Sequence, residues 1–135
     1  MKKLFIIFIS FVSILALPIQ YISAQTNEVP MQLIKAFETG NSETLASYFN
    51  DNIELVIPKT DNFFTKQQAK SILADFFRKN TVIDFVVVHK GAKENASFLI
   101  GTLVSSKGSY RVSVFARKTN GQSLVYQLRI EDPNE

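Results

Sequence analysis

The chain has 135 residues, of which 46% are hydrophobic and 20% are charged, and it contains neither cysteine nor tryptophan. This length suits one domain, and the apolar fraction excludes a disordered or low-complexity chain. Without Lys2 and Lys3, 13 basic residues remain against 12 acidic ones, so the net charge falls from +3 to +1. A nearly neutral domain has no field to attract nucleic acid or an acidic membrane surface, so neither partner is expected.

The two lysines precede an apolar stretch from Leu4 to Leu17, and a more polar tail ends at Ile22-Ser23-Ala24. This layout is typical of a secretory signal peptide over residues 1–24, cleaved before Gln25. We therefore expect an exported protein, periplasmic or secreted, with no stable membrane anchor after cleavage. Because cysteine is absent, disulfides are excluded and the core alone must stabilise the domain.

An uncleaved anchor from Leu4 to Ile22 is the alternative. The span is long enough to cross a bilayer. It is interrupted, however, by polar residues and a proline, namely Ser10, Ser13, Pro18 and Gln20.

A flexible leader is predicted for residues 25–29, ahead of a single domain over residues 30–131. The first helix is expected from Pro30 to Gly40, because proline suits the first helical turn and glycine favours the helix end. A second short helix follows, capped by Asn41 or Ser42.

After the second helix, Asn50-Asp51-Asn52 predicts a turn. A strand is expected from Ile53 to Ile57, where Pro58 ends it. The segment from Lys59 to Phe64 is predicted to be irregular, with at most a short extended piece at its end.

Thr65 and Gln68 predict a capping box, since each side chain can accept a hydrogen bond from the other residue's backbone N–H. The helix that they open carries apolar residues at a helical spacing and ends at Asn80. Beyond it the apolar period changes to two. Four strands of an antiparallel meander are expected near residues 82–90, 96–105, 109–118 and 122–131.

Two loops determine which side chains of the meander face the core. Ser106-Lys107-Gly108 and Thr119-Asn120-Gly121 each fit a three-residue hairpin loop whose glycine is left-handed. A two-residue Asn-Gly turn is the alternative, but it would place Val112 opposite Arg129 and mix apolar with polar residues. The three-residue loops are preferred because they make one face almost continuously apolar.

Several short strings accompany this element order: Lys35-Ala36-Phe37, Leu45-Ala46, Asn52-Ile53-Glu54-Leu55 and Tyr126-Gln127-Leu128-Arg129-Ile130-Glu131. From about Glu28 to Glu131 the chain resembles the nuclear-transport-factor-two-like superfamily, and within it a family of small exported bacterial proteins of unknown function. The resemblance implies an α+β, cone-shaped two-layer fold with three N-terminal helices on a curved, mostly antiparallel sheet. It implies no single function, because such folds include isomerases, dehydratases, ligand-binding modules and dimerisation domains.

Four polar side chains are predicted on the inward face, where they could orient a small apolar or amphipathic ligand. They are His89, Thr102, Tyr110 and Tyr126. Core or rim residues whose polar tips reach backbone or water are the alternative for all four. In the same register no Asp or Glu of the late strands faces inward, which argues against catalysis.

Six apolar residues are predicted on the outward face, where a contiguous set would mark an interface. They are Val86, Val88, Leu99, Leu103, Phe115 and Val125. We therefore expect a homodimer through the open sheet.

Arg111 is predicted directly opposite Arg129, with Arg117 nearby. Two opposed arginines repel unless an anion or Glu131 lies between them. These three arginines are candidates for an anion site, and a solvated pair bridged by Glu131 is the alternative.

The sequence favours an exported, non-enzymatic binding or interaction module that uses the cone pocket or the sheet face. Phosphate-binding glycine loops, paired-histidine metal spacings and cysteine are all absent, so no cofactor and no metal are predicted. One alternative is a small pocket enzyme of isomerase or hydrolase type, with His89 as its base. A purely structural dimerisation domain is another.

Overall fold

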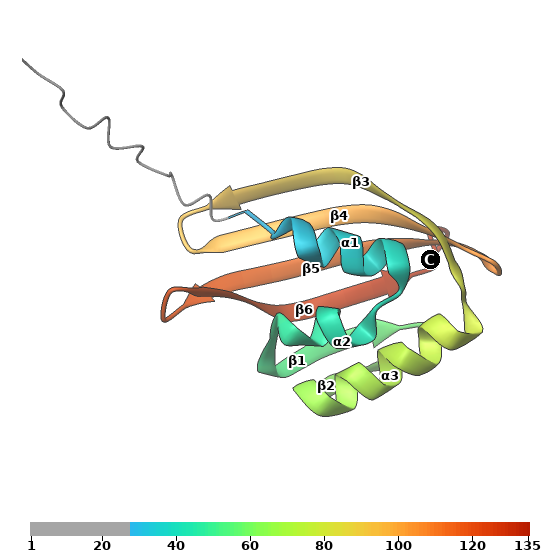
Figure 1. The fold of residues 1–135 in the computed structure, drawn as a ribbon, viewed down its shortest axis with the longest axis horizontal. Helices are drawn as coiled ribbons and strands as arrows, with labels where there is room; N and C mark the ends of the chain where they lie inside the picture. Colours follow the sequence, from blue (N-terminus) through green and yellow to red (C-terminus); the bar gives the residue numbers. More distant parts are fainter. Residues whose placement is uncertain (1–27) are drawn as a thin grey trace, which may run out of the picture.

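The computed structural model describes residues 28–135, so the predicted signal peptide and most of the predicted leader lie outside the described residues. Three helices and six strands follow in chain order (Figure 1). They are α1 (Met31–Thr39), α2 (Ser42–Ser47), β1 (Phe49–Ile57), β2 (Thr60–Thr65), α3 (Lys66–Lys79), β3 (Val82–Lys93), β4 (Ala96–Ser105), β5 (Gly108–Thr119) and β6 (Gln122–Glu131).

The strands form one sheet in the order β2-β1-β6-β5-β4-β3. All neighbouring strands are antiparallel except β1 and β6, which are parallel. The sheet is curved, and the helices lie on one of its faces (Figure 1). The predicted α+β class and the mostly antiparallel sheet are confirmed.

The helix boundaries follow from local chemistry. The predicted capping box is present at the start of α3, where Thr65 Oγ1 accepts from the Gln68 backbone N–H at 3.2 Å and Gln68 Oε1 accepts from the Thr65 backbone N–H at 3.0 Å. Helix α1 ends at Gly40 with φ of 63°, a left-handed conformation that glycine adopts without strain. Asn41 caps α2 through a hydrogen bond from the Thr44 backbone N–H.

Two sequence predictions between α2 and α3 are wrong. Residues 50–52 form no turn, because β1 already begins at Phe49 and runs through them. Residues 60–65 are not irregular but form β2, which pairs with β1 from Asn52 opposite Thr65 to Ile57 opposite Thr60. The polar composition of β2 concealed it, since it is an edge strand whose residues are mostly exposed.

The hairpin loops contain two residues each, not three. Ser105 pairs with Gly108 around Ser106-Lys107, and Thr119 pairs with Gln122 around Asn120-Gly121. Asn120 and Gly121 have φ of 50° and 80°, the pair of positive values typical of a two-residue type I′ turn.

A bulge in β6 explains why the two-residue turn does not mix the faces. The pairing shifts between Phe115 opposite Gln127 and Ala116 opposite Val125, so Tyr126 is the extra residue. Val112 therefore pairs with Ile130 rather than with Arg129. As predicted, Val112 and Leu128 share the core face, although through different partners from those expected.

The faces of β4 are the reverse of the prediction. Leu99 and Leu103 are fully buried, whereas Phe98 and Ile100 lie on the opposite face and are half-buried. Both faces of this strand are apolar, so the pattern alone could not determine its orientation.

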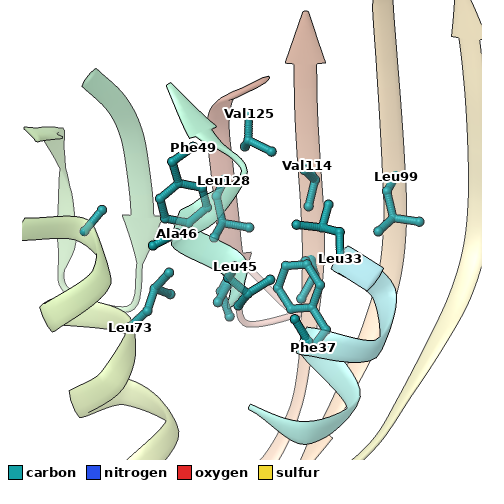
Figure 2. Packing of buried hydrophobic residues seen from close by; sticks show 14 of the residues in the cluster. Leu33, Phe37, Leu45, Ala46, Phe49, Leu73, Leu99, Val114, Val125 and Leu128 are labelled. Atoms are coloured by element: carbon teal, nitrogen blue, oxygen red, sulfur yellow. The ribbon is translucent and has the colours of Figure 1, made fainter. Parts of the chain in front are cut away.

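The core lies between the helices and the inner face of the sheet (Figure 2). Leu33 and Phe37 of α1 meet Leu99 and Val114 there. Val29, the last residue of the predicted leader, is also buried in this core. No helix among residues 28–135 is long and apolar enough to cross a membrane.

Candidate functional site

The outer face of the sheet, which no helix covers in Figure 1, carries an aromatic cluster. Phe98 of β4 lies directly opposite Phe115 of β5, and the ring of His89 on β3 packs on Phe98 with 5.1 Å between centroids. The bulged Tyr126 of β6 completes the cluster, and all four residues line one hollow of about 340 Å³ near the β3–β4 hairpin. We call His89, Phe98, Phe115 and Tyr126 the aromatic cluster.

Three of the four predicted inward residues lie on the outer face. His89 pairs with Ile100 after a bulge in β3, and residues directly opposite each other in a sheet share a face. Thr102 is on the same face as Ile100, and it lines neither the hollow nor the larger cleft described below. The bulge in β6 turns Tyr126 outward. Tyr110 alone faces inward, opposite Leu103.

The six predicted interface residues also divide between the core and the surface. Leu99, Leu103 and Val125 are core residues, with 0%, 0% and 2% of their surfaces exposed, because the register differs from the predicted one. Figure 2 shows Leu99 and Val125 directed into the core cluster. Val86 and Val88 are 49% and 64% exposed, and Phe115 is half-buried on the outer face.

The three arginines do not converge in the predicted way. Arg111 pairs with Glu131, and Arg129 pairs with Ser113. Arg129 Nε donates to Glu131 Oε1 at 2.9 Å, a bond that, with the charges of Glu131, Glu54 and Asp61, raises the pKa of Arg129. The guanidinium of Arg117 lies 4.6 Å from the ring centroid of Tyr126. Glu131 pairs with Arg129 through its side chain, and both its bridge to Arg111 and anion binding at the three arginines stay predictions.

The arrangement needed for His89 as a base is missing from the described part of the chain. No hydrogen bond joins its ring to another polar side chain there, and the ring packs on Phe98. Within residues 28–135, no group of three metal-ligating side chains is close enough together to hold an ion.

A larger cleft of about 630 Å³ lies at the other end of the sheet. One wall is the C-terminal half of α3, and the others are the β1–β2 turn, the β4–β5 turn and Tyr110. Sequence reasoning missed this cleft because it is bounded by the β1–β2 hairpin, which was not predicted. We call it the α3 cleft.

A chain of hydrogen bonds supports the floor of the α3 cleft. Tyr110 Oη donates to Asn80 Oδ1 at 2.9 Å, and Asn80 Nδ2 donates to the carbonyl oxygen of Phe76 at 2.9 Å. The ring of Tyr110 also packs edge-on against Phe76, with 5.3 Å between centroids. The end of α3 is thereby fixed to β5.

Solved structures show what this arrangement of elements is. The chain resembles a protein of the NTF2-like family from Streptomyces avermitilis, with a TM-score of 0.56 at 15% identity over 74% of this chain and 87% of that one. The fold is therefore NTF2-like, the superfamily that the sequence resembles.

Within this fold, the chain matches one particular family. Residues 31–131 match DUF4783, a domain of unknown function. A DUF4783 structure from Bacteroides ovatus is 38% identical, with a TM-score of 0.76 over 81% of this chain and 99% of that one. One from Bacteroides uniformis is 34% identical, with a TM-score of 0.75 over 79% and 99%. The chain belongs to the DUF4783 family. Comparison with curated proteins gave no match.

Proposed function

We propose that this protein is an exported, non-enzymatic interaction module that pairs with a second copy of itself through the outer face of its sheet. The observation that carries the proposal is the distribution of charge around the aromatic cluster on this face. Export is supported by the three-part N-terminal segment of the sequence.

The aromatic cluster has the composition of a buried interface patch. Aromatic residues and arginine are enriched at the buried centres of protein interfaces. Here Phe98, Phe115 and Tyr126 are half-buried, and Arg117 stacks on Tyr126. A partner that covers these side chains would remove apolar surface from water at little conformational cost, since neighbouring strands already hold the rings.

From β5 to β2, the charge on the outer face is segregated by strand. Strand β5 contributes two exposed arginines, Arg111 and Arg117. Glu54 of β1 and Asp61 of β2 lie on the same face, two and three strands away. Between them, β6 carries Arg129 and Glu131, which pair with each other.

This pattern is complementary to itself under a twofold rotation. Strand β6 separates β5 from β1, so a twofold axis above β6 places the arginines of each copy over the acidic strands of the other. Around this axis, five strands of one copy overlap those of the other, namely β2, β1, β6, β5 and β4. Strands about 30 Å long and about 5 Å apart then offer about 750 Å² per copy, which is close to the area of a standard-size interface.

Light scattering of the purified protein at micromolar concentration is expected to give the mass of a dimer. Reversal of both exposed arginines, Arg111→Glu with Arg117→Glu, is expected to give a monomer, because like charges then face each other. Both side chains are solvent-exposed, so the variant is expected to keep its fold, which circular dichroism checks.

The matched control reverses two lysines on the helical side, Lys35→Glu with Lys70→Glu. Net charge changes by the same amount, yet the dimer is expected to persist. A monomeric wild type, or equal dissociation in both variants, would contradict the proposed interface.

A further inference from the structure

We propose that the α3 cleft is a binding site for a small organic anion, an acidic head group on an apolar body. The site is on the opposite side of the sheet from the aromatic cluster, so this inference does not depend on the proposed dimer.

The first argument is the charge of the cleft. Three lysines line it, Lys59, Lys79 and Lys107, against one carboxylate, Asp75. Asp75 is already paired, since Lys79 Nζ lies 2.9 Å from its Oδ2 and Arg78 also contacts it. These partners lower the pKa of Asp75 through the hydrogen bond from Lys79 and the charges of both cations. The acid is therefore neutralised locally and leaves the other two lysines uncompensated.

The second argument is the position of those two lysines. Lys59 and Lys107 belong to the tight turns β1–β2 and β4–β5, on two sides of the cleft. Neither forms an ion pair with a carboxylate in the described part of the chain. Both are exposed, so an anion between the turns could reach either ammonium without being buried in the core.

The backbone at Lys59 adds to this point. Its φ is 71°, in the left-handed region where glycine is accommodated freely and a lysine is strained. The conformation follows from the two-residue turn that begins at Pro58. A lysine at this position costs backbone energy and places a cation at the rim of the cleft.

The third argument is the apolar part of the lining. Ile57 of β1 with Ile72 and Phe76 of α3 provide aliphatic and aromatic surface, and the ring of Tyr110 packs edge-on against Phe76. The Tyr110 hydroxyl donates its proton to Asn80, so it is engaged within the protein. An apolar body would lie on these side chains while its head group stays at the lysines, and the volume of about 630 Å³ is within the range of small-molecule sites.

Isothermal titration calorimetry tests the inference with the protein purified as its own cells process it. Sodium decanoate, used below its micelle concentration, is the anionic probe, and 1-decanol is the neutral probe of equal chain length. We expect decanoate to bind at one site, more tightly than decanol. Raising the ionic strength should lower the affinity for decanoate and leave the affinity for decanol unchanged.

The variant Lys59→Gln with Lys107→Gln is expected to lower the affinity for decanoate about tenfold, because it removes two partly exposed charge contacts. The affinity for decanol is expected to stay the same. The matched control is Lys35→Gln with Lys70→Gln, which removes the same charge away from the cleft and should bind as the wild type does.

Ile72→Gln tests the apolar wall separately and is expected to lower the affinity for both probes. No decanoate binding to the wild type, or equal affinity in the two lysine variants, would overturn the inference. Each of these results is distinguishable from failure of the dimer, because both double lysine variants keep every residue of the outer sheet face.

Discussion

Asp75 shows how a single residue couples the last turn of α3 to pH. The hydrogen bond from Lys79, with the charges of Lys79 and Arg78, lowers the pKa of Asp75 below its ordinary value of 3.8. A carboxyl whose pKa is depressed by folding stabilises the native state above its unfolded pKa, and this contribution is lost as the pH falls through the folded value.

We therefore expect Asp75→Asn to be less stable than the wild type at neutral pH. The difference should shrink as the pH falls below 3.8 and disappear beneath the folded pKa. Urea unfolding at a series of pH values measures it. Glu38→Gln is the control, since Glu38 is exposed on α1 and forms no ion pair within residues 28–135. A difference that grows on acidification would refute the assignment.

At the scale of an element, β4 shows how one strand serves two surfaces. Its inner side chains, Leu99 and Leu103, fill the core, and its outer ones, Phe98 and Ile100, belong to the face proposed as an interface. Between the leucines, Gly101 leaves room for Phe85, because a Cβ there would lie 2.5 Å from the ring. Truncating an inner side chain of β4 should therefore lower the free energy of unfolding more than truncating an outer one.

Adjacent truncations in β4 test this assignment. Leu103→Ala is expected to lower the free energy of unfolding by about 2–5 kcal/mol, because it opens a cavity in the core. Val104→Ala, on the half-buried outer side, is expected to cost less than about 1 kcal/mol. Chemical denaturation compares the two. If Val104→Ala cost more free energy of unfolding than Leu103→Ala, Val104 would face the core. The β4–β5 loop would then contain three residues and not the observed two.

For the whole molecule, the proposed dimer links stability to concentration. A partner that binds only the folded chain stabilises it by mass action, so the melting temperature should rise with protein concentration. Calorimetry over a hundredfold range of concentration measures this effect. The double arginine variant, Arg111→Glu with Arg117→Glu, is expected to melt at one temperature throughout. A concentration-independent wild type would argue that the sheet face is unpartnered.

Much of the fold could be predicted because its signals are local. The capping box at Thr65 and Gln68, the helical spacing of α3 and the period of two from β3 onward each depend on residues close together in the chain. Strand β2 gave no such signal, since an exposed edge strand carries no alternating apolar pattern.

The candidate sites were harder to predict because they depend on contacts between distant residues and on the exact number of residues in each loop and bulge. One residue more or less moves the following side chains to the other face of the sheet. One bulge at Tyr126 moves that ring to the outer face, and a loop shorter by one residue reverses β4. The α3 cleft assembles residues from β1, α3 and the β4–β5 turn, which no spacing in the sequence connects.

By itself, the sequence determined the α+β class, the C-terminal meander and the family resemblance, because helix caps and apolar periods act within a few residues. Only the tertiary structure decided which face of each strand is buried and which lysines share a cleft. The physical reason is that both faces of β4 are apolar, so packing against α1 had to select between them.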